Sequence, residues 1–253
     1  MKRNNTLAGI AACFFLGVTA HAASINVQFG CQSGASCNGA GGSTSAQTGA
    51  AVIGSAGDYW NMAASQNGSG SLNSLLDTGG AATSVGLTYS AASQWNEHDT
   101  SGANNYYNDT AFHGTPYENL MASYLVAGRG NSNVSLTGLT AGGEYSIYFY
   151  TQANKNTNGR VVDFNANGVT TSTTQVDADN LNTFVLGQNY AFADTFADGS
   201  GNLTITFNSG DSYEGDFNGF QLVGSDAAAA PEPSTAGLML LALGAGVRFL
   251  RRR

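Results

Sequence analysis

The chain has 253 residues, of which only 10% are charged, and it contains 34 glycines. Residues 23–230 carry three basic against sixteen acidic side chains, because most Lys and Arg stand at the two ends of the chain. This balance excludes nucleic acid as a partner and disfavours acidic polysaccharides, and an aromatic fraction of 10% in patterned runs argues against a disordered chain.

Residues 1–22 have the three parts of a secretory signal peptide. Lys2 and Arg3 form a basic start, residues 7–18 are an apolar run, and Ala20-His21-Ala22 is a small-x-small cleavage site. The run is too short for a membrane span. We therefore expect a signal helix, export through the Sec translocon and cleavage after Ala22.

The two cysteines of the mature chain, Cys31 and Cys37, are close in sequence within a Gly/Ser-rich stretch. In an oxidising compartment such a pair is expected to form a disulfide. A metal site or a redox pair is the alternative, although no CxxC spacing and no nearby His support it.

Strand signals recur along residues 23–225. Apolar and polar residues alternate in several short runs, separated by Gly and Asn, which is typical of half-buried strands. These runs are residues 24–29, 83–90, 144–150, 202–207 and 218–223. Residues 160–176 are expected to form a hairpin, because Asn167-Gly168 suits a type I′ turn. Trp60 in "GDYWN" is expected in the core.

One segment breaks this pattern and predicts a helix at about 116–127. Thr115, Pro116 and Glu118 have the spacing of a capped helix start, and Gly128 is a natural stop. The apolar stripe at helical spacing comprises Leu120, Met121, Tyr124 and Leu125. We expect one amphipathic helix of about three turns against an all-β jelly-roll sandwich that spans residues 23–225 as one domain.

Five stretches of residues 23–225 carry a family resemblance: "INVQFG", "GDYWN", "LTGLTAGGEYSIYFYT", "GNLTITF" and "NGFQLVG". Together they resemble galactose-binding-like jelly-roll domains. The fold hosts carbohydrate-binding modules, lectins and inert structural domains, so the resemblance by itself leaves the function open.

The stretch "SQWNEHDTSGANNYYND" is the predicted glycan-binding loop. A sugar needs a flat aromatic face and amide or carboxylate groups for its hydroxyls, and this stretch offers both. The candidate residues are Trp95, Asn96, Glu97, His98, Asp99, Asn104, Asn105, Tyr106 and Tyr107. The alternative is a surface loop whose aromatic side chains tuck into the edge of the sandwich.

Two acidic stretches have the oxygen-rich composition that calcium prefers. One contains Asp177, Asp179 and Asn180, and the other is "SGDSYEGDFNG", with Asp211, Glu214 and Asp216. Neither matches an EF-hand loop, and solvated turn residues are the alternative. A structural calcium is the one cofactor that we expect from these residues.

Residues 231–253 consist of three distinct parts. They contain Pro231-Glu232-Pro233, an apolar stretch over 234–247 and a terminal arginine cluster. In this order the three parts resemble the PEP-CTERM signal, which implies an exosortase partner, a transient hydrophobic helix in the inner membrane, cleavage near the motif and release to the cell surface or matrix. A plain C-terminal anchor is the alternative. We take residues 226–253 as linker plus signal.

These observations predict an exported surface or extracellular-matrix protein that associates with neutral exopolysaccharide through a jelly roll. No catalytic triad, zinc motif, P-loop or dinucleotide fingerprint is present, so we expect no enzyme. The alternatives are a structural matrix protein that binds no sugar and a polysaccharide-degrading enzyme, which requires two opposed carboxylates.

Overall fold

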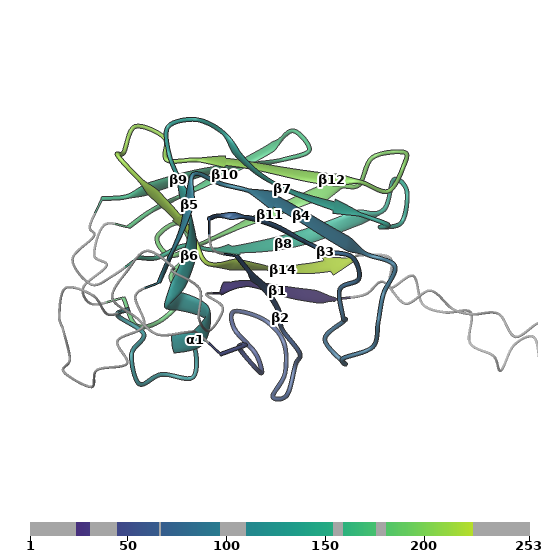
Figure 1. Cartoon of the computed structure of the whole chain (residues 1–253), viewed down its shortest axis with the longest axis horizontal. Helices are drawn as coiled ribbons and strands as arrows, with labels where there is room; N and C mark the ends of the chain where they lie inside the picture. The colour runs from purple at the N-terminus through teal and green to yellow at the C-terminus, as the bar shows by residue number, and fades with distance from the viewer. Residues whose placement is uncertain are drawn as a thin grey trace, which may run out of the picture. The chain divides into compact units, whose positions relative to one another are not determined.

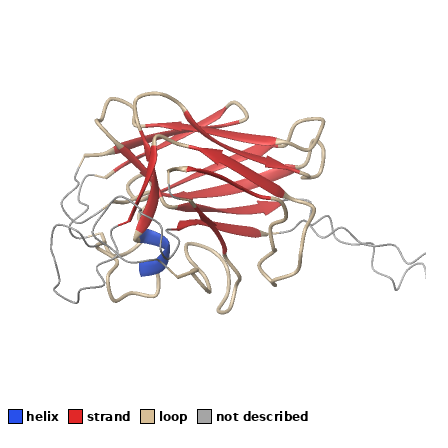
Figure 2. Ribbon diagram, viewed as in Figure 1, coloured by secondary structure: helices blue, strands red, loops and turns tan. Residues whose placement is uncertain are grey.

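The computed structural model describes residues 24–30, 45–65, 67–96, 110–153, 159–175 and 181–224. All of them belong to one compact unit, Ala22–Ala228. Strands dominate this part of the chain, and the single α-helix described is very short (Figure 2). The predicted signal peptide, the disulfide between Cys31 and Cys37 and the C-terminal sorting signal lie outside the described residues.

The elements follow one another along the chain in this order. They are β1 (Ile25–Gly30), β2 (Asn61–Ala64), β3 (Ser69–Leu72), β4 (Gly86–Ser90), β5 (Ser93–Asn96), α1 (Glu118–Met121), β6 (Ser123–Ala127), β7 (Ser132–Thr137), β8 (Glu144–Tyr150), β9 (Val161–Ala166), β10 (Val169–Thr174), β11 (Tyr190–Phe196), β12 (Leu203–Asn208), β13 (Gly215–Phe217) and β14 (Gly219–Gly224).

The strands form a jelly-roll β-sandwich, as the sequence predicted (Figure 1). A five-stranded sheet has the order β11-β8-β14-β1-β2, and a six-stranded sheet has the order β10-β9-β12-β7-β4-β3. A small sheet, β13-β6-β5, is the third. Neighbouring strands are antiparallel, except β1 and β2, which run parallel.

Alternation along the strands decides which side chains fill the core. In β12, Leu203, Ile205 and Phe207 are buried, whereas the residues between them face outward. The hairpin of β9 and β10 turns at Asn167 and Gly168, whose φ values are +47° and +97°. Two consecutive positive φ values are what a type I′ turn requires, so this predicted turn is confirmed.

Phe217 lies at the centre of the main core. Although it belongs to the small sheet, its ring contacts five other buried aromatic rings, at centroid distances from 4.9 to 6.3 Å. These rings belong to Phe29, Phe149, Phe164, Phe207 and Phe220. The small sheet is therefore joined to both large sheets through one side chain.

A second apolar cluster covers the outside of the five-stranded sheet. Trp60 is 1% exposed, which confirms its predicted place in the interior, and its Nε1 donates to the carbonyl oxygen of Gly49 at 2.8 Å. Its neighbours in the cluster include Phe112, Leu120, Met121 and Tyr150. Segment 45–60 and α1 are thereby packed against the outer side of β8.

The predicted helix over 116–127 is wrong beyond its first turn. Only Glu118–Met121 is helical, and Ser123–Ala127 is strand β6. All four residues of the predicted stripe are buried, but they are buried by two different backbone conformations. Leu125 pairs with Phe217 on one side and with Gln94 on the other, and these long-range ladders outweigh the local helical pattern.

The predicted helix cap also differs. Tyr117 occupies the N-cap position without a side-chain hydrogen bond. Glu118 instead accepts from the backbone N–H of Gly114 at 2.8 Å and lies 3.1 Å from His113 Nδ1. The acidic side chain therefore closes the turn before the helix. Within the described residues no helix is long and apolar enough to cross a membrane.

Candidate functional site

The outward side of the six-stranded sheet is lined almost entirely by Ser, Thr and Asn. We call this side the polar face. The strand registers place these residues in rows that run across the strands. The central row comprises Thr170, Asn165, Thr206, Asn133, Ser90 and Ser69, one from each strand from β10 to β3. The next row contains Thr204, Ser135, Thr88 and Ser71.

A hollow of about 530 Å³ opens on this face over β10, β9 and β12. Two short rows of residues form its floor, and each row has one residue from each of these three strands. The rows are Thr170, Asn165 and Thr206, and Ser172, Asp163 and Asn208. Its lining residues are Asn131, Asp163, Phe164, Asn165, Thr170, Thr171, Ser172, Thr206 and Asn208. The volume lies within the range of small-molecule sites, and nearly every lining side chain carries a hydrogen-bonding group.

The hydrogen bonds within the hollow leave part of these groups available. Asn165 Oδ1 accepts from the N–H of Gly168 at 2.8 Å, which fixes the amide, whereas its NH₂ group donates no hydrogen bond to the described residues. Asn208 donates to Asn131 Oδ1 at 3.3 Å, and its own Oδ1 accepts from Gly210 N–H at 2.8 Å. Asp163 is the single carboxylate among the described residues that line the hollow.

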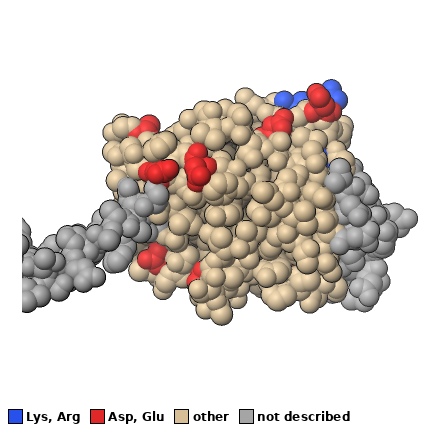
Figure 3. Space-filling model, turned by 180° about the vertical axis from the view of Figure 1, so that it is seen from behind, with Lys and Arg blue, Asp and Glu red and all other residues tan. Residues whose placement is uncertain are grey.

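Positive charge is scarce on the described surface. Arg129 and Arg160 are the Lys and Arg residues within the described ranges, and Arg160 is engaged in an ion pair. In the view of Figure 3, blue gathers at one corner, and the red groups are scattered over a mostly uncharged surface. A surface of this kind favours a neutral ligand over an anionic one.

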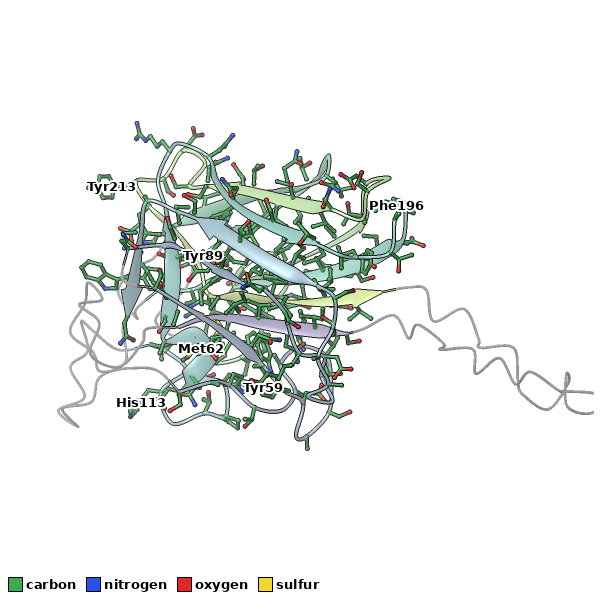
Figure 4. The ribbon with its side chains drawn as sticks, turned by 45° about the vertical axis from the view of Figure 1, so that its right-hand side comes forward. Tyr59, Met62, Tyr89, His113, Phe196 and Tyr213 are labelled. Atoms are coloured by element: carbon green, nitrogen blue, oxygen red, sulfur yellow. The ribbon has the colours of Figure 1, made fainter. Side chains whose placement is uncertain are left out.

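Three exposed aromatic residues, Tyr59, Phe196 and Tyr213, do not gather into one patch. Tyr213 is 89% exposed and Phe196 57% exposed, yet they lie at opposite ends of the sandwich, with Tyr59 on a third side (Figure 4). An apolar docking surface is therefore not built from these three residues. This distribution leaves hydroxyl and amide groups as the chief chemistry of the described exterior.

Trp95 lies on strand β5 rather than in a loop. It is half-buried and stands opposite Tyr124 of β6, which is 1% exposed. Asn96, its neighbour in the predicted glycan-binding loop, is buried, and its Oδ1 accepts from Ser123 Oγ at 3.3 Å. The other candidates of this loop, Glu97, His98, Asp99, Asn104, Asn105, Tyr106 and Tyr107, lie outside the described residues.

The acidic stretch 211–216 holds an ion pair instead of the suggested calcium set. Arg160 Nη1 donates to Asp216 Oδ1 at 2.6 Å and to Glu214 Oε1 at 3.1 Å. Gln175 Nε2 donates to the second oxygen of Asp216 at 3.2 Å. A guanidinium in contact with both carboxylates opposes a cation there, and the described residues contain no group of three or more metal-ligating side chains.

Burial and the contact between Arg160 and Asp216 shift the pKa of each group in opposite directions. The Asp216 carboxyl is fully buried, which raises its pKa to about 6 although the Arg160 charge acts in the opposite direction. For Arg160, burial lowers the pKa, but the combined effect of Asp216, Tyr124 and Glu214 and of the hydrogen bond to Asp216 raises the pKa above its ordinary value. The cluster is therefore a built-in charge pair rather than an open ligand site.

The second calcium candidate, Asp177, Asp179 and Asn180, lies outside the described residues. The last described residue before this stretch is Gln175, and it donates a hydrogen bond to Asp216 of the small sheet. The predicted glycan-binding loop also starts from this sheet, after Asn96 of β5. The structure thus attaches the first residues of both predicted stretches to one sheet.

Sequence reasoning missed the polar face. Its signal was present in the alternation of Thr204, Thr206 and Asn208, and of Asn133 and Ser135. Each strand by itself looks like an ordinary solvent-facing pattern. Only the registers between distant strands show that these residues form continuous rows.

Comparisons with known proteins give only partial structural likenesses. No protein-family model and no curated protein matches the chain. A CBM35 from Cellvibrio japonicus is 16% identical, with a TM-score of 0.30, and the match covers 39% of this chain and 67% of that one. A family 35 carbohydrate binding module from Clostridium thermocellum is 18% identical, with a TM-score of 0.29, over 40% of this chain and 78% of that one.

An enzyme shows a similar partial likeness. The exo-beta-1,3-galactanase from Phanerochaete chrysosporium is 21% identical, with a TM-score of 0.30, and the match covers 40% of this chain but only 23% of the galactanase. Likenesses at such TM-scores carry no argument about this chain. The jelly-roll assignment therefore rests on the strand order.

Proposed function

We propose that this protein is a non-enzymatic surface or matrix component that binds neutral extracellular polysaccharide on the polar face. The observation that carries the proposal is the hollow over β10, β9 and β12, which is lined by amides, hydroxyls and one carboxylate. Sugar hydroxyls both donate and accept hydrogen bonds, so they suit a surface that offers both roles without net positive charge.

Export and C-terminal processing complete the proposal. The signal-peptide pattern and the Pro231-Glu232-Pro233 motif support delivery through the Sec translocon and cleavage by an exosortase. Mass spectrometry of the surface form tests this directly. We expect a mature N-terminus at Ala23 and the loss of the arginine cluster, and an intact C-terminus would overturn the processing step.

The hollow does not support the hydrolase alternative. Glycoside hydrolysis by acid–base chemistry uses two carboxyl groups on either side of the scissile bond. Among the lining residues that the structure describes, Asp163 is the single carboxylate. Release of reducing ends from a bound polymer by the purified protein would contradict the non-enzymatic assignment.

The binding test uses the processed chain and a panel of neutral polysaccharides that includes the host's own exopolysaccharide. The double variant Asn165→Ala and Thr206→Val removes an amide and a hydroxyl from the hollow, and we expect about tenfold weaker binding. Because no ion pair is involved, the affinity of the unaltered protein should change little with salt. A folded protein that binds no member of the panel would favour the purely structural alternative.

The predicted glycan-binding loop needs a separate arm of this test. Trp95 is half-buried at the edge of the small sheet, so Trp95→Ala removes an aromatic surface away from the hollow. If the loop contributes, this variant weakens polysaccharide retention while the hollow is intact. Unchanged retention by a folded Trp95→Ala variant would remove the loop from the proposal.

A further inference from the structure

The polar face extends well beyond the hollow. The hollow occupies the part of the central row on β10, β9 and β12, and the row continues over β7, β4 and β3. Asn133, Ser90 and Ser69 supply this continuation, and all three are exposed. Hydrogen-bonding groups therefore line a path that crosses the whole six-stranded sheet.

The path has a length that suits a chain rather than a single sugar. Neighbouring strands lie about 4.8 Å apart, so six strands place the ends of the central row about 24 Å apart. Ser, Thr and Asn side chains are short. None of the six residues of the central row is therefore large enough to block a ligand between the hollow and β3. A ligand seated in the hollow thus meets no large side chain of this row in its continuation toward β3.

The groups in the continuation are also free to change partners. Ser69 Oγ and Ser90 Oγ lie 3.4 Å apart, which is a long hydroxyl contact. Asn133 stands between Thr206 and Ser90 in the register, and its side chain makes no hydrogen bond with the other described residues. A ligand can therefore replace water here without breaking a strong internal bond.

We propose that the polar face binds an internal stretch of an extended neutral polysaccharide, which lies across the strands along the central row. This inference rests on the proposed function and adds to it the form of the ligand. The affinity of the site depends on the length of the polysaccharide chain, and the hollow is the deepest part of the site. The site does not select a chain end or a single sugar.

The first experiment measures affinity against chain length. The polysaccharide bound in the panel is cut and fractionated into a ladder from the disaccharide to the octasaccharide, and each fraction is titrated by calorimetry. We expect affinity to rise by about tenfold or more along the ladder before it levels off, because longer chains reach more of the row. Equal affinity for all lengths would overturn the extended-chain inference while leaving sugar binding in the hollow intact.

The second experiment uses Asn133→Ala, which alters the row outside the hollow. Asn182→Ala is the matched control, because Asn182 is an exposed asparagine outside the sheets. We expect Asn133→Ala to weaken binding of the longest oligosaccharides several-fold and to leave the shortest ones unchanged. The control should behave like the unaltered protein.

The outcomes separate the two proposals. If no oligosaccharide and no polymer of the panel binds, the proposed function falls and the extended-chain inference falls with it. If binding is lost in the hollow variant but is unaffected at every length by Asn133→Ala, the hollow alone is the site. Thermal unfolding of each variant checks that the altered surfaces have not changed the fold.

Discussion

At the scale of single residues, the buried polar side chains decide where the irregular segments sit. Asn218 is fully buried, and its amide NH₂ group lies within 3.1 Å of three carbonyl oxygens, those of Met121, Ser123 and Gln152. Its Oδ1 accepts from the N–H of Gln152 at 2.5 Å. One side chain therefore ties the end of α1 and the start of β6 to the end of β8.

We predict that Asn218→Asp is strongly destabilising. The substitution places a carboxylate oxygen against carbonyl oxygens that now accept a hydrogen bond, so it should lower the free energy of unfolding by more than about 3 kcal/mol. Urea denaturation measures this difference. The same change at exposed Asn182 should stay within about 0.5 kcal/mol, and equal effects at the two sites would contradict the role of Asn218.

The Arg160 pair sets a pH dependence. The pKa of Asp216 in the folded protein, about 6, lies above that of an unfolded Asp, about 4. A raised folded pKa means that the stability contributed by protonated Asp216 is present below about pH 4 and is lost as the pH rises through about 6. Arg160 limits this loss because it pairs with the ionised form.

We predict that Arg160→Gln is nearly harmless in acid and costly at neutral pH. Without the guanidinium, the buried Asp216 side chain is stable only as the protonated carboxylic acid. Loss of the partner from a buried ion pair costs about 3–5 kcal/mol of stability when the remaining group is ionised. The loss of unfolding free energy in Arg160→Gln, relative to the unaltered protein, should therefore be small at about pH 4 and large at about pH 8. Arg129→Gln removes the same charge from an exposed site, and a similar pH-dependent loss there would argue against the pair.

At the scale of elements, the strand pairing of residues 123–127 outweighs their local helical pattern. Residues 118–127 have helical periodicity, yet the chain leaves the helix at Ala122 and enters β6. A helix of this length gains little from its own hydrogen bonds. The β6 strand instead gains two neighbours, β5 and β13, and places Leu125 in the main core.

The connection between β7 and β8 depends on two glycines with different constraints. Gly138 and Gly142 both have positive φ, +78° and +67°. A Cβ at Gly138 would collide with the backbone carbonyl of Ser84, whereas a Cβ at Gly142 would meet nothing within 4 Å. The first glycine is needed for close approach of two segments, and the second for backbone conformation alone.

We predict that Gly138→Ala destabilises the fold more than Gly142→Ala does. Gly142→Ala should cost about 1–2 kcal/mol, the usual penalty of the left-handed conformation. Gly138→Ala adds the clash with Ser84, which should raise the cost by about 1–3 kcal/mol. Chemical denaturation of both variants gives the comparison, and equal losses would show that the Ser84 segment moves freely aside.

At the scale of the whole molecule, one aromatic core joins the three sheets. Phe217 contacts rings from both large sheets, whereas Phe196 is 57% exposed at one end of the sandwich. A cavity at Phe217 would be surrounded by other rings that cannot close it without leaving their own contacts. The stability of the sandwich is thus concentrated where the small sheet enters it.

We predict that Phe217→Ala lowers the free energy of unfolding by about 3–5 kcal/mol. Phe196→Ala is the control of identical chemistry, and its effect should stay within about 0.5 kcal/mol because the ring is mostly exposed. Differential scanning calorimetry should show a single transition in the unaltered domain. Comparable losses for both variants would refute the central role of Phe217.

The sequence by itself determined the class of fold and half of the described strands. Alternation in runs such as Leu203, Ile205 and Phe207 assigns buried faces strand by strand, because side chains in a strand point to opposite sides. The Asn167-Gly168 turn was readable for the same reason, since its backbone requirement is local. The excess of acidic over basic side chains in residues 23–230 also indicated a neutral partner from the sequence alone.

Only the tertiary structure decided how these local patterns combine. The polar rows exist because six strands from distant parts of the chain pair in one register, and no single strand encodes a register with another. The same is true of Arg160 and Asp216, which are 56 residues apart in sequence. Strand β6, too, is a product of neighbours that the local sequence does not contain.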